Sequence, residues 1–394
     1  MSDLRAAAAA FNGFRPAHES LTLVRAVPTC FIQYDHGTKV GGHPTERIAL
    51  LHGPSGEGKT YFTLGQTKSF LAVNNPVLMV DAERTTDKGF ALLALAELLK
   101  HPLYFYERPD TYEEVVQRVR KWCNIVKRLR ETKKIHVDAC GLIIVDSIRK
   151  MVPEDQWNRI LELKKAEKGD KKEKLRDRSA QIKALMNAAW CDELIPLLEQ
   201  TGCTMIIVAR ETDDPNATER QKMYGGGKKT GGGGALYYDA SLDIRTERAS
   251  YVTKDMGEGV KPIVYGERHR ITIKKSKIAG KEDKTIVCYF HTSNGVFIPP
   301  GFDPARDVLE LARRFDIVRV AAPKQKKGEP KKKPAKGGGG WLSWNGQRWQ
   351  GEHSAVKKLS ESPELLKQLS AEVRAMLKGT KPIEIDEATG EVFE

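Results

Sequence analysis

The chain has 394 residues, more than the about 100 to 200 residues of one ordinary domain, so we expect one large domain with small attachments. No apolar stretch approaches the roughly 20 residues that cross a bilayer, and the first residues lack the long apolar segment of a signal peptide. We therefore expect neither a membrane-spanning nor a secreted protein but a cytoplasmic one. The net charge of +13 is compatible with a polyanionic partner, but it does not indicate one by itself.

The six cysteines are scattered along the chain: Cys30, Cys123, Cys140, Cys191, Cys203 and Cys288. They form no CxxC pair and have no histidines at zinc-ligand spacing, which argues against both a structural zinc site and a disulfide framework. We expect them to be ordinary thiols in a reducing compartment.

Taken in chain order, the first residues predict a short helix, and residues 47–52 predict a buried strand. Three more short apolar runs follow, at 77–80, 142–145 and 205–208. Each run is hydrophobic throughout, as is typical of strands in a parallel sheet that is covered on both faces. Helical periodicity marks the stretches 90–99, 113–130 and 179–199. The sequence therefore predicts an α/β fold with a mostly parallel, twisted sheet flanked by helices.

A phosphate-binding motif follows the first buried strand and precedes a helical run. The motif G-x-x-x-x-G-K-[ST] is formed by Gly53, Pro54, Ser55, Gly56, Glu57, Gly58, Lys59 and Thr60, with Tyr61 next in the chain. Glycines let backbone N–H groups close around phosphates, and we expect Lys59 to reach the β- and γ-phosphates and Thr60 to bind Mg²⁺. We therefore predict ATP and Mg²⁺ as cofactors. The alternative is a chance glycine turn.

Two carboxylates follow buried strands. Asp146 closes the apolar run LIIVD, where a phosphate-loop protein holds its magnesium ion, although such a residue can also be a helix cap. Glu83 ends the earlier strand in VDAE, close enough in such a sheet to orient an attacking water. A solvated carboxylate at the end of a strand is the alternative for Glu83.

Two long segments interrupt the alternation of strands and helices. Residues 162–178 are densely charged, and residues 213–234 are rich in glycine and lysine without a hydrophobic period. Loops of this length inside a compact domain are usually functional or disordered.

The C-terminal part of the chain has its own organisation. Residues 324–336 and the glycines 337–340 predict a flexible basic linker, which either contacts duplex phosphates or is only a spacer. Beyond it, residues 341–377 predict a small module with a helix at 363–377, and an acidic tail covers 384–394.

The order and spacing of several motifs resemble the RecA recombinase family. They are VDAER at 80–84, PDTYEE at 109–114, IIVDS at 143–147, TGGGGAL at 230–236, LDIR at 242–245 and KSKIA at 275–279. The small C-terminal module and the acidic tail also resemble those of the family. The resemblance therefore covers nearly the whole chain.

The resemblance implies roles for particular residues. Glu83 would be the catalytic glutamate, and Asp87 and Phe90 would lie near the adenine. Asp146 would belong to the motif that holds the magnesium ion.

Lys275 and Lys277 would reach the ATP of a neighbouring subunit, so that hydrolysis depends on filament formation. Without the resemblance, these lysines would be interpreted as a solvated strand face.

The resemblance also implies two DNA-binding loops, one at 150–178 and one at 212–234. The candidate DNA contacts are Arg176, Ser179, Lys183, Arg220, Lys222, Met223, Tyr224, Lys228, Lys229, Gly231 and Gly232. Basic side chains and glycine backbone suit phosphates, and Met223 or Tyr224 could wedge between bases or stack on them. The alternative is a basic loop without a ligand.

One candidate catalytic residue departs from the family pattern. Arg210 stands where the family has a glutamine that senses the γ-phosphate and relays its presence to the second loop. A guanidinium makes stronger phosphate contacts than an amide, so the family's switching behaviour does not carry over to this position without a test.

These expectations define a P-loop NTPase with a RecA-like core at 33–300. An N-terminal helix and polymerisation arm occupy 1–32, and a small α+β C-terminal domain occupies 301–380. The basic flexible linker at 322–340 interrupts that domain, and an acidic tail follows at 381–394.

The expected function is that of an ATP-dependent recombinase without a membrane partner. It would form a helical filament on single-stranded DNA, pair it with homologous double-stranded DNA, and hydrolyse ATP in a DNA-dependent manner. Two alternatives remain: a hexameric helicase or packaging motor on the same core, and a recombination mediator that coats DNA but hydrolyses ATP poorly. Arg210 motivates the second alternative.

Overall fold

The computed structural model describes residues 23–156, 158, 179–213, 218, 228–231, 233–254, 256–257, 259–278, 285–321, 340–378, 383–385 and 392–393. The expected N-terminal helix, most of both long loops and residues 322–339 of the basic linker lie outside these ranges. Among the described helices, none combines the length and the apolar composition needed to cross a membrane.

A parallel sheet forms the centre of the molecule. Its order is β10-β3-β7-β6-β4-β5, with β3 at Ile48–His52, β4 at Val77–Asp81, β5 at Tyr104–Glu107, β6 at Gly141–Asp146, β7 at Cys203–Val208 and β10 at Leu242–Lys254. Each neighbouring pair is parallel, which confirms the predicted α/β fold. All residues of β3, β4, β6 and β7 are buried, as their continuous apolar runs indicate.

Antiparallel strands extend this sheet beyond β10. They are β11 (Ile263–Ser276), β12 (Thr285–Ser293), β13 (Gly301–Phe302), β17 (Ile383–Ile385) and β18 (Val392–Phe393). The sequence did not predict the long β10–β11 hairpin, whose outer residues are largely polar and exposed. Part of the acidic tail also joins the sheet, because β17 pairs with β12.

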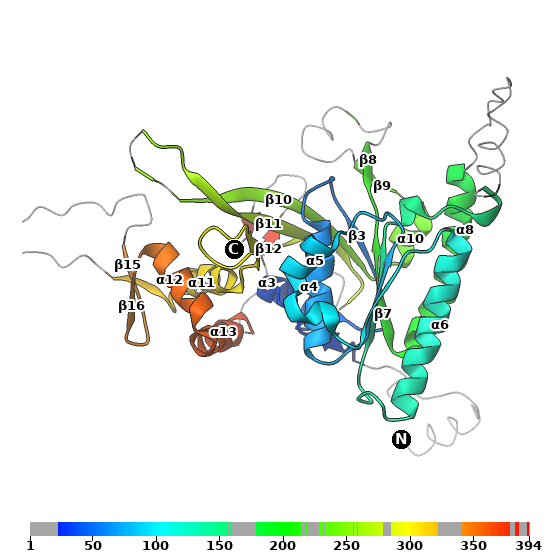
Figure 1. Cartoon of the computed structure of the whole chain (residues 1–394), viewed down its shortest axis with the longest axis horizontal. Coiled ribbons are helices and arrows are strands. Elements are labelled where there is room, and N and C mark those ends of the chain that lie inside the picture. The colour runs from blue at the N-terminus through cyan, green and yellow to red at the C-terminus, as the bar shows by residue number, and fades with distance from the viewer. Residues whose placement is uncertain are drawn as a thin grey trace, which may run out of the picture.

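Helices cover both faces of the sheet (Figure 1). On one face lie α6 (Tyr112–Glu131), α8 (Ser179–Thr201) and α10 (Gly234–Asp239), and on the other lie α3 (Ile32–Gly37) and α4 (Lys59–Ala72). Alternate strand residues face the two layers: Ile143 and Val145 pack toward α6 and α8, whereas Leu142 and Ile144 pack toward α4. Helix α5 (Lys88–Leu95) and the 3-10 turn η1 (Ala96–Lys100) pack beside α4.

Capping side chains explain where two predicted helices begin. The Asp87 carboxylate accepts hydrogen bonds from the N–H groups of Gly89 (2.7 Å) and Phe90 (3.2 Å), so α5 starts directly after it. The Thr111 hydroxyl accepts from the Glu114 N–H at 3.2 Å and starts α6 in the same way. The predicted helix at 363–377 is confirmed by α13.

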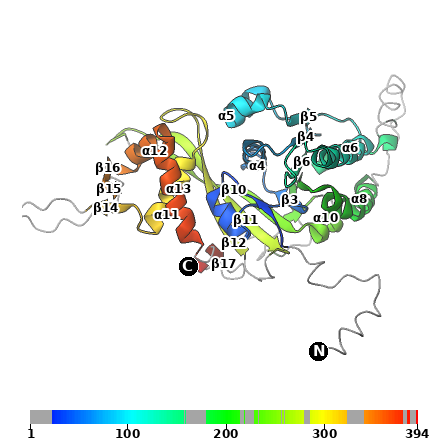
Figure 2. The same cartoon turned by 90° about the horizontal axis from the view of Figure 1, so that it is seen from below.

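The described residues 304–321 and 340–377 form a smaller unit, which we call the C-terminal module. It contains α11 (Pro304–Arg314), α12 (Gly351–Glu361), α13 (Pro363–Leu377), β14 (Arg319–Ala321), β15 (Trp341–Trp344) and β16 (Gln347–Gln350). The stacked rings of Trp344 and Trp349 lie in its own apolar core. Figure 2 shows the module at the opposite end of the molecule from α6 and α8.

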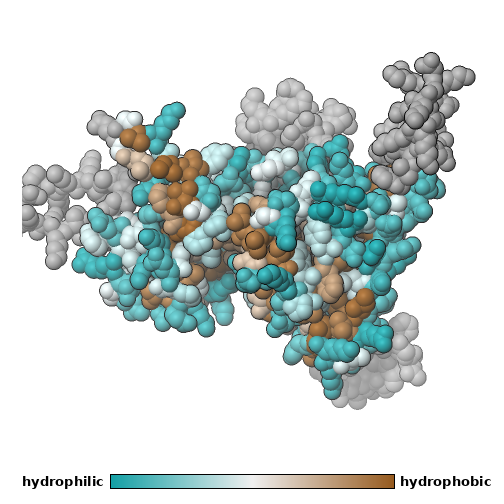
Figure 3. All heavy atoms as spheres, in the orientation of Figure 1, coloured by the Kyte–Doolittle hydropathy of each residue, from teal (hydrophilic) through white to brown (hydrophobic). Residues whose placement is uncertain are grey.

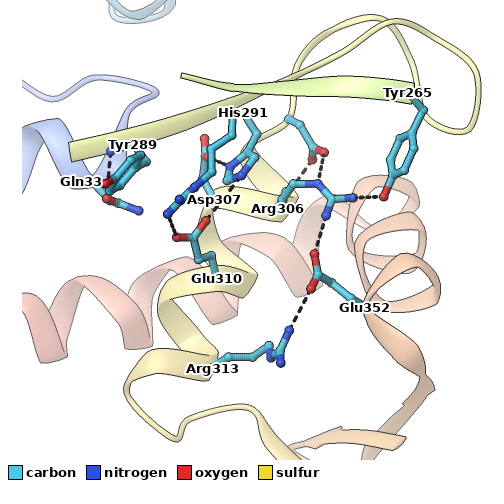
Figure 4. A network of polar contacts seen from close by, with 11 residues as sticks. Gln33, Tyr265, Tyr289, His291, Arg306, Asp307, Glu310, Arg313 and Glu352 are labelled. Carbon is cyan, nitrogen blue, oxygen red and sulfur yellow. Dashed lines mark hydrogen bonds and ion pairs between the residues drawn. The ribbon is translucent and has the colours of Figure 1, made fainter. Parts of the chain in front are cut away.

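Buried polar contacts anchor the C-terminal module to the sheet (Figure 4). His291 on β12 lies 2.8 Å from the Asp307 carboxylate on α11. The Arg306 guanidinium donates to Asp303 at 3.1 Å and to the Tyr265 hydroxyl of β11 at 2.7 Å. Because these groups are buried, loss of either partner would leave an uncompensated polar atom, and the contacts therefore fix the module's position.

The remaining short elements are β1 (Ala26–Val27), β2 (His43–Pro44), η2 (Ile148–Lys150), β8 (Glu211–Asp213) and β9 (Lys228–Thr230).

Candidate active site

The phosphate loop, residues 53–58, connects the end of β3 to the start of α4. Gly53 and Gly58 have φ values of +148° and +95°. A Cβ atom on Gly53 would lie 2.1 Å from the Thr246 carbonyl oxygen, and one on Gly58 would lie 2.6 Å from His269 Nδ1. Both positions therefore require glycine, for conformation and for space.

Lys59 is the first residue of α4 and lies over the phosphate loop. Its ammonium donates hydrogen bonds to the carbonyl oxygens of Gly53 (2.8 Å) and Pro54 (2.5 Å). Burial lowers the pKa of Lys59, while the Asp146 carboxylate acts in the opposite direction. The preceding residue, Gly58, has no side chain that caps the first N–H groups of α4, so this helix end suits an anion.

Asp81 and Asp146 lie side by side at the carboxyl edge of the sheet, because they are register partners of β4 and β6. Asp81 accepts hydrogen bonds from the N–H groups of Arg84 (2.6 Å) and Thr86 (3.3 Å) and from the Tyr106 hydroxyl. These bonds hold the turn after β4, so Asp81 has a structural role.

The Asp146 carboxylate has no hydrogen-bond partner within the described ranges. Burial, and then the neighbouring Asp81, raise its pKa to about 6, although Lys59 opposes the shift. A buried carboxylate beside the phosphate loop that has no hydrogen-bond partner among the described residues fits a divalent cation, and Asp146 and Thr60 are the residues that would hold Mg²⁺. The sequence singled out Asp146 but missed Asp81, although both strands end in aspartate.

Glu83 lies in the turn after β4, because that strand ends at Asp81 rather than at Glu83 as expected. Its N–H donates to the Asp146 carbonyl at 3.0 Å, and its carboxylate accepts from the Ser147 hydroxyl at 3.2 Å. The Arg210 guanidinium forms an ion pair with the other carboxylate oxygen. The side chain of Glu83 is 11% exposed, so the candidate base is largely enclosed by these partners.

An aromatic group stands beside the first turn of α4. The rings of Tyr61 and Phe90 meet edge to face at 4.9 Å between centroids, and Phe302 lies 6.0 Å from Tyr61. The candidate adenine contacts Phe90 and Asp87 are therefore adjacent to the helix that carries Lys59. The Asp87 carboxylate also caps α5.

Lys275 and Lys277 lie together at the end of α10. Lys275 donates to the carbonyl oxygens of Tyr237 and Tyr238, the latter at 3.1 Å, and Lys277 donates to that of Tyr238 at 2.5 Å. Burial and then Lys277 lower the pKa of Lys275. In the described part of the chain neither lysine contacts the phosphate loop, so this pair and the exposed ring of Tyr238 form a separate surface.

The second long loop begins and ends at a short antiparallel pair, β8 and β9. The Arg210 carbonyl oxygen accepts a hydrogen bond from the Gly231 N–H at 2.9 Å, just beyond this pair. The same residue thus contacts Glu83 with its side chain and the base of the loop with its backbone.

The candidate DNA contacts are only partly placed. Lys183 on α8 donates to the Arg149 carbonyl at 3.3 Å, Ser179 begins α8, and Lys228 and Lys229 lie in β9. Figure 1 shows β8 and β9 on the upper side of the molecule, with the labelled α8 to their right. Gly231 directly follows β9, and the remaining candidates lie outside the described residues: Arg176, Arg220, Lys222, Met223, Tyr224 and Gly232.

A largely buried charged network adjoins the phosphate loop at His52, and nothing in the sequence indicated it. His52 Nδ1 lies 2.8 Å from Glu211, and its Nε2 lies 3.1 Å from Asp243. Arg245 donates to Glu211 at 2.7 Å. Burial acts to raise the pKa of Glu211, but hydrogen bonds from His52 and Arg245 outweigh it and lower the pKa to about 2. The network ties the end of β3 to the first residue of β8.

The family comparison agrees with this geometry. The model of the RecA N-terminal domain matches residues 15–292, more than half of the chain. The chain belongs to the RecA family.

Similar relatives of this RecA-family chain include proteins named Protein RecA from three organisms. The one from Geobacter sulfurreducens is 26% identical over 363 residues, covering 91% of this chain and 87% of the relative. Those from Thermus thermophilus and Haemophilus ducreyi are 25% and 24% identical, covering 89% and 90% of this chain and 85% and 78% of the relatives. The matched family segment contains the phosphate loop, Glu83, Asp146, Arg210 and the lysine pair.

Proposed function

We propose that this RecA-family chain is an ATP-dependent recombinase. It forms a helical filament on single-stranded DNA, pairs that strand with a homologous duplex, and hydrolyses ATP when DNA is bound. The observation that carries the proposal is the position of Arg210. Its side chain contacts Glu83, the candidate proton acceptor, and its carbonyl oxygen contacts Gly231, where the second loop ends. Such a connection lets nucleotide occupancy and loop conformation depend on one another.

The nucleotide would bind on the phosphate loop. The N–H groups of the loop and the Lys59 ammonium would hold the phosphates, and Asp146 and Thr60 would hold Mg²⁺, which neutralises phosphate charge when bound. Glu83 would accept a proton from the attacking water.

Two surfaces support self-association, and the first is the free edge of strand β5, the last strand of the sheet. An apolar groove of about 280 Å³ lies beside this edge, and the residues that line it include Phe105, Trp122 and Ile125. Apolar side chains gather in this region at the lower right of Figure 3. An open strand edge beside an apolar groove suits an added strand, and the expected polymerisation arm of a second copy would supply it.

The lysine pair would provide the opposite side of the interface. Lys275 and Lys277 stand near exposed Tyr238 and, among the described residues, make no contact with the chain's own phosphate loop, as residues that reach a neighbour's ATP should. Hydrolysis would then require assembled subunits.

A second candidate, a mediator that coats DNA and hydrolyses ATP poorly, is favoured by the Arg210–Glu83 ion pair. A carboxylate that is neutralised by a guanidinium is a weak proton acceptor. If the pair persists when ATP binds, turnover will be slow.

Three measurements on the full chain test the proposal: ATP turnover with and without single-stranded DNA, imaging of the protein with DNA and a non-hydrolysable ATP analogue, and strand exchange. We expect DNA-stimulated turnover, filaments, and exchange with a homologous but not a heterologous duplex. Coated DNA without stimulated turnover or exchange would support the mediator. Closed rings would support the helicase-like motor and overturn the recombinase.

A further inference from the structure

We propose that Arg248 is a positioning residue of the phosphate loop, which holds the Glu57 carboxylate away from the phosphates that the loop binds. Glu57 is the one acidic residue of the motif at 53–60, and it stands directly before Gly58 and Lys59. A carboxylate at such a place repels a polyphosphate unless its charge is offset and its direction is fixed. The inference rests on the proposed function, because it assumes that the phosphate loop binds ATP.

The β10–β11 hairpin forms a wall against which the phosphate loop packs. Arg248 of β10 and His269 of β11 are register partners, and they contact consecutive residues of the loop. Arg248 binds Glu57. The next loop residue, Gly58, lies against His269, where a Cβ atom would be 2.6 Å from Nδ1. Strand β10 pairs with β3 only as far as Arg245, so the N–H group of Arg248 lies beyond that pairing and can serve the loop.

Arg248 holds both carboxylate oxygens of Glu57. Its backbone N–H donates to one oxygen at 2.6 Å, and its guanidinium donates to the other at 3.2 Å. The guanidinium is itself fixed, because it also donates to Glu267 at 3.0 Å and lies over the Tyr251 ring, 4.8 Å from the centroid. The side chains of Glu57 and Arg248 are 23% and 30% exposed, so water screens their charges only in part.

The charge of Glu57 reaches the ammonium that would bind phosphate. Burial lowers the pKa of Lys59, and the Glu57 carboxylate is among the groups that oppose this shift. The negative charge that favours the ammonium disfavours phosphate anions beside it. Arg248 keeps this repulsion small, because its own charge offsets that of Glu57 and its two hydrogen bonds direct the carboxylate toward the hairpin.

A double-mutant cycle on nucleotide affinity tests this role. The dissociation constant of a non-hydrolysable ATP analogue is measured without DNA for the native chain, Arg248→Gln, Glu57→Gln and the double variant. We expect Arg248→Gln to weaken binding about three- to tenfold at low salt, and the double variant to bind like the native chain. Glu57→Gln should tighten binding more in the Arg248→Gln background than in the native chain. Raising the salt from about 50 to about 500 mM should reduce this difference.

Arg270→Gln is the matched control, because it removes the same charge from the same hairpin, where Arg270 pairs with Glu247. We expect it to weaken binding less than Arg248→Gln does, and to the same extent with and without Glu57→Gln. Thermal unfolding of every variant checks the fold. If Arg248→Gln does not fold, the cycle is run with Arg248→Lys, which keeps the charge but not the planar fork that binds a carboxylate.

Three results would overturn the inference. Unchanged affinity in Arg248→Gln would show that the arginine does not serve the loop. Equal effects of Glu57→Gln in the native and the Arg248→Gln backgrounds would show that Arg248 does not hold Glu57. A weakening that neither Glu57→Gln nor salt reverses would show a purely structural role in the hairpin. Each result leaves the proposed function standing, since DNA-stimulated turnover is measured separately, whereas failure of the native chain to bind any nucleotide overturns both.

Discussion

Replacing Lys59 with alanine tests the phosphate loop directly. The ammonium donates to two loop carbonyls, at 2.8 and 2.5 Å, so it already lies where the phosphates of a nucleotide would be held. Nucleotide binding exchanges these neutral acceptors for a charged one.

The size of the effect follows from this exchange. A hydrogen bond to a charged group contributes about 1.5 to 3 kcal/mol, which corresponds to a loss of about 10- to 150-fold in ATP affinity. The fold should survive, because Lys59 is only partly buried and water can replace its bonds to the loop.

Isothermal titration with ATP and with a non-hydrolysable analogue measures this loss, and ATP-dependent DNA binding should disappear with it. The matched control is Lys127→Ala, which removes an exposed lysine from α6, far along the chain from the loop. Undiminished ATP affinity in Lys59→Ala would refute the site.

Further outcomes are expected at other positions. Lys275→Ala or Lys277→Ala should impair ATP hydrolysis by assembled subunits but not ATP binding by isolated subunits. Mixing either variant with Lys59→Ala subunits should restore activity at interfaces where an intact phosphate loop meets an intact lysine pair. If no activity is recovered, the site is not shared between subunits. Gly58→Ala should destabilise the chain more than Gly56→Ala in urea unfolding, because both positions have positive φ but only the first lies against His269; equal losses would contradict this. Burial lowers the pKa of His43 to about 3, so the unfolded chain binds the extra proton as pH falls and stability is lost below about pH 6.5. His43→Gln should remove about 2 kcal/mol of the stability difference between pH 8 and pH 5, and an unchanged difference would contradict the assignment.

Much of the architecture is determined by short stretches of sequence. Continuous apolar runs of four to six residues predicted the buried strands, because a strand covered on both faces has no polar side. Helical periodicity located α6, α8 and α13. The phosphate loop was predicted for the same local reason, since its glycines, lysine and threonine act within eight residues.

The contacts between these stretches were decided by tertiary structure. Sheet order is not chain order, so Arg210 meets Glu83 across a separation of 127 residues, and His52 meets Glu211 across 159. No periodicity or motif spacing in the sequence indicates contacts between residues this far apart. Asp81 and Asp146 both end apolar strands, so the sequence does not distinguish their roles. In the structure the Asp81 carboxylate is bonded to the turn after its strand, whereas Asp146 has no hydrogen-bond partner among the described residues. Charge and spacing identify which residues can do chemistry, but packing decides which of them meet.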